Sequence, residues 1–241
     1  GKGMVLNTGN RLYVTGYTNS GNFPTRNSYQ SSYEGGSWDA FVSQLSSSGS
    51  ALIYSTYLGG GRVETGEGVQ IDSDDKAYII GYTDSYDFPT FNPYQPGRRG
   101  VSFDVFAAKL SSSGSFLIYS TYMGGMYDDR GLGLALDMEN HAYLVGYTQS
   151  DDFPTNNPYQ SDRKGGTDVF ITKFSLSGSS IIYSTYLGGI DNDQGRDISL
   201  DTGSQVYVTG YTQSGNFPTK NPYQSNIRGD MDAFVSKISS S

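Results

Sequence analysis

Apolar and polar residues alternate along short segments of the chain. In Gly68–Asp72 the apolar side chains Val69 and Ile71 occupy every second position, and Leu134 with Leu136 has the same spacing. A period of two residues places such side chains on one face of a β-strand. The sequence has no sustained apolar period of 3.6 residues, so the alternation predicts an all-β chain.

The predicted strands belong to a unit that occurs four times. Its longest motif is Ile-Tyr-Ser-Thr-Tyr-Leu-Gly-Gly, at residues 53–60 and again at 182–189. Residues 118–125 carry it with Met123 in place of leucine. A second motif begins with Tyr-Val-Thr-Gly-Tyr-Thr at Tyr13 and has counterparts at Tyr78, Tyr143 and Tyr207. A repeat of about 65 residues indicates a solenoid, a propeller or an array.

Each unit predicts four strands, of which the second copy is the clearest. The first strand lies in Gly66–Asp72, the second in Ala77–Tyr82, the third begins at Asp104, and the fourth is the motif at 118–125. All eight prolines lie in the long loops between the second and third strands. Proline has no backbone N–H group, and at these positions its absence removes no hydrogen bond from a sheet. The links are too short for helical crossovers, so the unit is an antiparallel meander.

One glycine recurs in the second strand, where it leaves room for a neighbouring backbone or ring. Its copies are Gly16, Gly81, Gly146 and Gly210.

A four-stranded meander has two faces to bury, and stacking successive units ~10 Å apart buries them. Accumulated twist then predicts a ring, which is a β-propeller. We expect one domain over residues 1–241, with four-stranded blades at about 1–65, 66–130, 131–194 and 195–241. The short, Gly-rich first strand suits the centre, and the Tyr-rich fourth strand suits the rim.

The order of these motifs resembles the SBBP β-propeller repeat family. Ala-Tyr-x-x-Gly-Tyr-Thr is followed by Phe-Pro-Thr, then Asp-x-Phe-x-x-Lys-Leu-Ser-x-x-Gly, then Ile-Tyr-Ser-Thr-Tyr-Leu-Gly-Gly, over essentially the whole chain. The resemblance implies an exported or surface-attached protein of a bacterium or archaeon, with no assigned reaction. It transfers no catalytic residue to this sequence.

The fourth unit departs from the pattern, because the sequence stops at Ser239-Ser240-Ser241, before a fourth strand. We therefore expect fifteen strands and an unpaired edge on the last one, a template for another strand. The chain is a fragment of a longer array, or a neighbouring chain adds a strand, or a three-stranded blade is tolerated. A larger ring shared between chains is also open. The predicted assembly edge consists of Asp232, Phe234, Ser236 and Ile238.

Composition and charge exclude several classes. The net charge is −8 and no basic stripe is present, which argues against a nucleic-acid partner. No apolar run approaches the ~20 residues that span a bilayer. The chain opens on Gly1-Lys2-Gly3 without an apolar signal segment. It has no cysteine, so disulfides, thiolate metal sites and a cysteine nucleophile are excluded.

Aspartate supplies 20 of the 24 acidic residues, which indicates turn chemistry or, alternatively, cation binding. An aspartate at a strand entrance can accept backbone N–H groups from the preceding loop, or it can belong to a repeated ligand site. The loop aromatics, such as Phe153 with Tyr159, either pin each loop onto its own sheet or form a ligand platform. The ligand-binding candidates are Asp39, Asp104, Asp168, Asp232, Tyr29, Tyr94, Tyr159 and Tyr223.

Calcium is the one cofactor hypothesis. Residues 191–195 begin like a calcium loop but lack its final glutamate. The metal candidates are Asp128, Asp129, Asp191 and Asp193. The single histidine, His141, is expected at an exposed, variable turn, which disfavours a catalytic triad or a histidine-bound metal.

We interpret the sequence as a non-enzymatic extracellular β-propeller that acts as a surface scaffold, binding module or self-assembling subunit. Its loop face would contact protein or glycan, and its incomplete blade would contact another chain. The alternative is an enzyme that acts on polysaccharide, because paired carboxyls can serve a glycosidase. The sequence marks no unique pair, and fold alone does not license an activity.

Overall fold

The computed structural model describes residues 1–239, and this part of the chain forms fifteen β-strands and no helix. We call the four sheets blades 1 to 4 in chain order. Ser240 and Ser241, at the end of the predicted fourth blade, lie outside the described residues. The strands are β1 (Gly3–Leu6), β2 (Leu12–Thr18), β3 (Asp39–Leu45), β4 (Leu52–Leu58), β5 (Glu64–Ile71), β6 (Ala77–Thr83), β7 (Asp104–Leu110), β8 (Leu117–Met123), β9 (Asp129–Leu136), β10 (Ala142–Thr148), β11 (Asp168–Phe174), β12 (Ile181–Leu187), β13 (Asp193–Leu200), β14 (Val206–Thr212) and β15 (Asp232–Ile238).

Each blade is an antiparallel meander whose strands follow chain order. Blades 1 to 3 each have four strands, whereas blade 4 consists of β13, β14 and β15. The third strand of every blade begins at the predicted aspartate. The all-β fold, the four blades and the missing last strand are therefore confirmed.

An aspartate organises the turn between the first and second strands. The Asp72 Oδ1 accepts the backbone N–H groups of Asp74 and Lys76, both at 3.0 Å. Asp75 has a φ of 63°, the left-handed conformation that asparagine and aspartate tolerate. Asp137 and Asp201 hold the corresponding turns in the same way. At these three positions the abundance of aspartate reflects turn chemistry.

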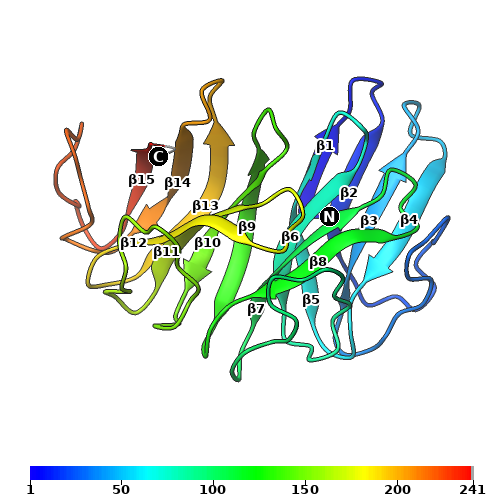
Figure 1. Cartoon of the computed structure of the whole chain (residues 1–241), viewed down its shortest axis with the longest axis horizontal. Coiled ribbons are helices and arrows are strands. Elements are labelled where there is room, and N and C mark those ends of the chain that lie inside the picture. The colour runs from blue at the N-terminus through cyan, green and yellow to red at the C-terminus, as the bar shows by residue number, and fades with distance from the viewer. Residues whose placement is uncertain (240–241) are drawn as a thin grey trace.

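The blades pack face to face in a row (Figure 1). The inner strands lie at the junctions: β5 contacts β1 and β2, β9 contacts β5 and β6, and β13 contacts β9 and β10. Blades 1 and 4 lie at opposite ends of the row, so the predicted ring is wrong for one chain. A ring of four blades needs a turn of about 90° at each junction. Since the row is open, at least one of its junctions turns by less.

Each junction has its own apolar core. Between blades 2 and 3, Val105 and Ala107 of β7 belong to one cluster with Leu134 of β9 and Leu144 of β10. Corresponding clusters join blades 1 and 2 and blades 3 and 4. Every internal blade thus buries one face against the preceding blade and the other against the following blade.

The long loop between the second and third strands returns along the outer strand of its own blade. In blade 2 the Phe91 N–H donates to the Ser120 carbonyl at 3.0 Å, and the Ser120 N–H donates back at 2.8 Å. Gln95 and Tyr122 form a second bridge. The outer strand β8 therefore has backbone partners on both edges. Blades 1 and 3 share this arrangement, with bridges Arg26–Ser55 and Asn156–Ser184.

The phenylalanine of the Phe-Pro-Thr motif anchors this loop to the sheet. The Phe88 ring packs 4.6 Å from the Phe106 ring, and Phe153 packs 4.7 Å from Phe170, measured between centroids. Both Phe88 and Phe153 are buried. The predicted pinning of the loop is confirmed for its phenylalanine.

Gly146 lies at a bulge where β10 approaches β9 closely. A Cβ on Gly146 would lie 1.9 Å from the Arg130 carbonyl oxygen and 2.8 Å from the Phe170 ring. The close approach predicted for this repeated glycine is therefore present, with both a backbone and a ring as neighbours.

Replacing Gly146 by alanine should lower the free energy of unfolding by about 1–3 kcal/mol, because the new methyl group overpacks a rigid backbone contact. Urea denaturation followed by circular dichroism measures this change. Gly21→Ala is the matched control, since a Cβ there meets no atom within 4 Å. Equal stabilities of the two variants would contradict the packing argument.

Candidate functional sites at the blade junctions

The aspartate that begins each third strand is bound by its own loop, and it is buried in blades 1 to 3. In blade 2 the Asp104 Oδ2 accepts the Arg99 N–H and the Gln95 Nε2, each at 2.9 Å. Gln95 Nε2 also donates to the Gly97 carbonyl at 3.0 Å. The same pairs recur as Gln30–Asp39, Gln160–Asp168 and Gln224–Asp232. These aspartates accept loop N–H groups, as the sequence predicted for a structural role.

The Gly-Gly pair after the outer strand joins one blade to the next. The Gly124 N–H donates to the Gln95 Oε1 at 3.1 Å, and the Gly125 N–H donates to the Asp129 Oδ2 at 2.7 Å. Asp129 begins β9 and also accepts the hydroxyls of Thr148 and Ser150. Glu64 and Asp193 receive the N–H groups of Gly60 and Gly189 in the same way.

Two buried carboxyl groups flank the first glycine of this pair. A Cβ on Gly124 would lie 2.7 Å from the Asp104 Cγ and 2.8 Å from the Asp129 Oδ2. Neither Asp104 nor Asp129 is exposed to solvent. The Asp104 Oδ1 has no hydrogen-bond partner. Both the dry surroundings and the unpaired oxygen favour the protonated form of this pair.

Burial is the main cause of raised pKa values at these junctions. It raises the pKa of Asp104 to about 7 and that of Asp129 to about 8, and repulsion from Asp104 adds to the latter. In blade 1, burial raises the pKa of Asp39 to about 6 and that of Glu64 to about 7. The pKa of Asp168 is raised for the same reason.

These carboxyls should make the protein more stable in mild acid. In the unfolded chain they titrate near pH 4. Between about pH 4 and 8 the folded chain holds protons that the unfolded chain has released, so stability falls as the pH rises. A pKa difference of one between the two states corresponds to about 1.4 kcal/mol. We expect the melting temperature to rise by on the order of 5–10 °C from pH 8 to pH 5.

Asp129→Asn should flatten this pH dependence, because asparagine mimics the neutral carboxyl. Asp230→Asn, at an exposed position, should leave it unchanged. Calorimetric scans at several pH values measure the effect. A melting temperature that rises with pH in the parent chain would exclude the argument.

A cluster of aspartate, lysine and tyrosine lies near the turn between the first and second strands, and in blade 2 it is buried. In blade 2 the Lys109 Nζ lies 3.2 Å from the Asp72 Oδ2 and donates to the Tyr78 hydroxyl. Burial lowers the pKa of Lys109. Blades 3 and 4 have the pairs Asp137–Lys173 and Asp201–Lys237 at 3.1 and 3.6 Å. None of these residues is among the candidates predicted from the sequence.

Blade 1 replaces the aspartate and the lysine of this cluster by neutral side chains, and Asp75 of blade 2 accepts a hydrogen bond from one of them, Asn7, at 2.9 Å. Asn7 stands at the position of Asp72, and Gln44 stands at the position of Lys109. The Gln44 Nε2 donates to the Tyr13 hydroxyl at 2.5 Å. The two charges are thus absent together, which indicates a structural pair rather than a site for chemistry.

Lys109→Gln should destabilise the protein by about 3 kcal/mol, because it leaves the buried Asp72 carboxylate without its cation. The double variant Asp72→Asn with Lys109→Gln should recover most of this loss, since it copies blade 1. Urea denaturation of both variants measures the difference. A double variant no more stable than Lys109→Gln alone would show that the pair is not interchangeable.

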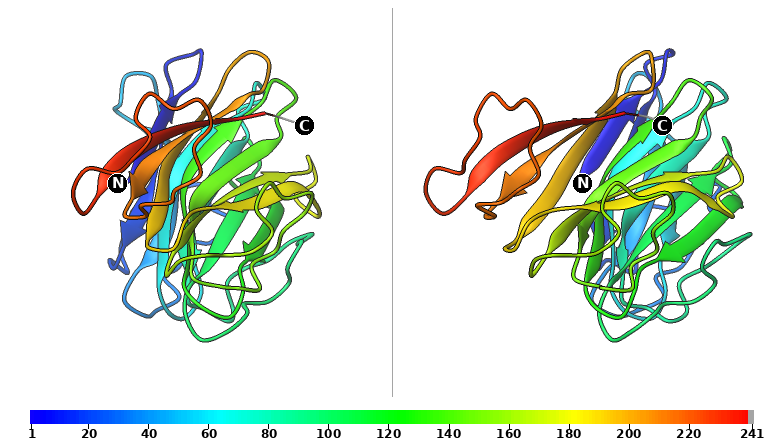
Figure 2. Two further views of the ribbon diagram at one scale, coloured as in Figure 1. Left: turned by 90° about the vertical axis from the view of Figure 1, so that its left-hand side faces the viewer. Right: turned by 60° about the vertical axis from the view of Figure 1, so that its left-hand side comes forward.

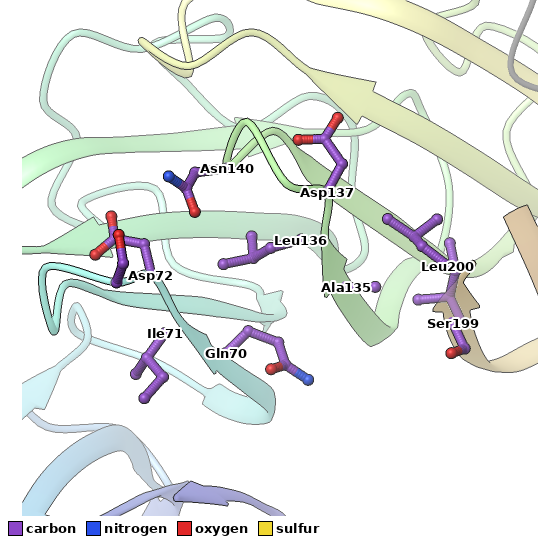
Figure 3. A pocket seen from close by; sticks show the side chains of 11 residues that line it. Gln70, Ile71, Asp72, Ala135, Leu136, Asp137, Asn140, Ser199 and Leu200 are labelled. Atoms are coloured by element: carbon purple, nitrogen blue, oxygen red, sulfur yellow. The ribbon is translucent and has the colours of Figure 1, made fainter. Parts of the chain in front are cut away.

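A shallow pocket of about 350 Å³ lies where the inner strands of blades 2, 3 and 4 end (Figure 3). Asp72, Asp137 and Asn140 line its rim, and Ala135, Leu136 and Leu200 are among its apolar walls (Figure 3). Asp72 and Asp137 are already paired with lysines. The pocket therefore offers no carboxylate without a cation.

His141 is less exposed than predicted. Its side chain is only 14% exposed, and its Nδ1 lies 3.1 Å from the Asp137 Oδ2. The ring packs over the turn that Asp137 organises, and this contact removes it from solvent. The imidazole of His141 contributes to this turn, and the polar partners of its ring are the carboxylates of Asp137 and Glu139.

The four metal candidates occupy different surroundings. Asp191 is exposed, whereas Asp193 is buried and binds Gly189 and Ser214. Asp128 pairs with Arg130 at 3.1 Å. Within residues 1–239 no group of three or more acidic or histidine side chains is placed to hold a metal ion. The loop at 191–195 thus does not gather the carboxylates that its spacing suggested.

The loop tyrosines do not share the anchoring role of the phenylalanines. Tyr159 and Tyr223 are exposed, and Tyr94 leans toward the next blade, where its ring centroid lies 6.1 Å from that of Phe174. The Tyr29 N–H donates to Gly114 of blade 2. The pinning predicted for Tyr94 is therefore wrong, because its ring packs on the neighbouring blade, a contact that one repeat cannot reveal.

The predicted assembly-edge residues occupy alternate positions of β15, so their side chains lie on one face of the strand, the less exposed one. Phe234 is buried against Phe217, with ring centroids 4.7 Å apart. Ser236 and Ile238 are partly buried, and Asp232 binds Gln224 and Arg228 of its own loop. β15 pairs with β14 along its inner edge. The large apolar side chain exposed on this strand is Val235, which is not among the residues predicted from the sequence.

The antiparallel blades, packed through repeated junctions, define a β-propeller repeat protein. Residues 53–89 and 182–218 match the SBBP beta-propeller repeat, so the chain carries repeats of this family. Each matched segment runs from the outer strand of one blade through the first two strands of the next. The search of curated proteins gave no match. Residues 1–239 include no helix long and apolar enough to cross a membrane.

Proposed function

We propose that the chain is a non-enzymatic scaffold that self-associates through the two end faces of its row of blades. The observation that carries the proposal is the exposure of residues that every internal junction buries. Val235 is 77% exposed, whereas its counterparts Val42, Ala107 and Ile171 are buried. Met4 is 76% exposed, and its counterparts Val69, Leu134 and Ile198 are likewise buried.

The two end faces complement each other. At the junction of blades 2 and 3, Ala107 and Leu134 belong to the same apolar cluster. Val235 of blade 4 and Met4 of blade 1 occupy these positions at the two ends. Blade 4 of one copy can therefore pack on blade 1 of a second copy in the way that internal blades pack. This head-to-tail contact joins different surfaces, and it forms a ring when its rotation closes.

Two copies joined at both ends would form a ring of eight blades. Closed propellers have four to eight blades as a rule. One copy is open, and three copies would exceed this range. A dimer is therefore the assembly that the proposal favours.

The non-enzymatic role is supported by the burial of the paired carboxyls. Asp104 and Asp129 are closed to solvent, so a polysaccharide chain cannot reach them without opening the junction. We further propose a location outside a bacterial or archaeal cell, as a surface protein with protein or glycan partners. The proposed location and partners rest on the resemblance to SBBP repeats. Release of reducing sugars from polysaccharides would contradict the non-enzymatic role.

Val235→Asp should raise the dissociation constant of the dimer at least tenfold, because it places a charge in an apolar contact. Met4→Asp should have the same effect from the other end. Val101→Asp is the matched control, since Val101 is 78% exposed on the loop of blade 2. Sedimentation velocity over a range of concentrations measures association. A parent chain that stays monomeric throughout would overturn the proposal, and filaments would replace the ring with an open assembly.

A further inference from the structure

Blades 1 to 3 hold their outer strands by one repeated set of contacts. In blade 3, β12 lies between β11 and the long loop, which forms backbone hydrogen bonds to it through Asn156 and Gln160. The Thr185 Oγ1 accepts the Gln160 N–H at 2.9 Å. The Tyr186 hydroxyl donates to the Ser150 carbonyl at 2.8 Å.

The first glycine after the strand completes this set. The Gly188 N–H donates to the Gln160 Oε1 at 3.1 Å. A Cβ on Gly188 would lie 2.5 Å from the Asp168 Cγ, so no larger residue fits. The outer strand is thus recognised at a threonine, a tyrosine and a glycine, in the pattern Thr-Tyr-x-Gly.

Blade 4 presents the same receiving groups without an outer strand. The Gln224 Nε2 donates to the Asp232 Oδ2 at 2.6 Å and to the Asn226 carbonyl at 2.9 Å. The Arg228 N–H donates to Asp232 at 2.9 Å. These bonds match those of Gln160, Lys164 and Asp168 in blade 3. The glutamine and aspartate are therefore held in their binding geometry by the loop alone.

An open cavity lies against the long loop of blade 4. It has a volume of about 630 Å³ and is lined by Tyr223, Gln224, Ser225, Asn226 and Arg228. Figure 2 shows the loop between β14 and β15 standing away from β15. Phe217 is partly exposed, whereas its counterparts Phe88 and Phe153, which pack on outer-strand tyrosines, are buried.

We propose that this slot between β15 and the loop binds an extended peptide segment with the pattern Ser-Thr-Tyr-x-Gly-Gly. The segment adds to the edge of β15 as an antiparallel strand and bonds to the loop on its other side. Its threonine accepts the Gln224 N–H, its tyrosine donates to the Ser214 carbonyl, and its first glycine donates to the Gln224 Oε1. The slot lies at the rim of blade 4, apart from the Val235 face, and so does not depend on self-association.

A peptide with the sequence of residues 179–189, labelled at its N-terminus, tests the proposal on the whole chain. We expect binding in the micromolar range by fluorescence anisotropy. A peptide with Gly188→Ala should bind at least tenfold more weakly, because its methyl group meets the Asp232 carboxyl. A scrambled peptide should not bind. Equal binding of the three peptides, or no binding of the first, overturns the proposal.

Substitutions in the chain locate the peptide. Gln224→Ala should weaken binding at least tenfold, whereas Gln213→Ala, on the neighbouring turn of the same blade, should leave it unchanged. Hydrogen exchange of the Asp232–Ile238 amides should slow when the peptide binds. Protection elsewhere without protection of β15 contradicts the slot. Binding by Val235→Asp separates the outcome from self-association, because this variant removes only the end face.

Discussion

The fold depends on the Gly-Gly pair that links the rim of one blade to the centre of the next. Its two N–H groups donate to a glutamine of the finished blade and to a carboxylate of the next blade. Side-chain atoms fill the space where a Cβ on Gly124 would lie. Because the acceptors belong to different blades, the pair fixes the position of each new sheet on the last. This local bond set explains why the outer-strand motif ends in two glycines.

The charged groups of the protein are largely committed to holding loops and turns. Asp104 binds its loop, Asp129 binds the glycine link, and Asp72 binds a turn and a lysine. Blade 1 replaces the last of these pairs by Asn7 and Gln44 and keeps the turn. The repeated acidic residues therefore serve the architecture, the strand-entrance aspartate in all four blades and the turn aspartate and the carboxylate of the glycine link three times each. Their number says little about chemistry at any single place.

The sequence predicted the strands because their alternation and turn residues act locally. Val69 and Ile71 predict a strand with one buried face, and Asp104 predicts the start of a strand. Neither prediction depends on how the blades are arranged relative to one another. The open row could not be predicted, because the turn per junction is a sum of small packing angles. The roles of Tyr94 and Tyr29 were missed for a similar reason, since both contact the next blade.

Two parts of the site left signals that the sequence analysis did not use. A glutamine recurs at one position of every long loop, because its side-chain amide both donates and accepts a hydrogen bond there. Its copies are Gln30, Gln95, Gln160 and Gln224. The joint change of Asp72 and Lys109 to Asn7 and Gln44 in blade 1 marks two residues that touch. Exposure of Val235 has no such signal, because its counterparts look the same in sequence and differ only in what covers them.

The loop that runs outside each complete outer strand has a consequence for how the protein comes apart. A rim strand such as β8 cannot peel away until two ladders break, one to β7 and one to the loop. Such a strand is protected from stepwise fraying, and its escape requires a large concerted opening with a high barrier. β1 and β15, the first and last strands of the described chain, each have a ladder on one edge only, so mechanical or proteolytic unravelling should begin at one of these two strands.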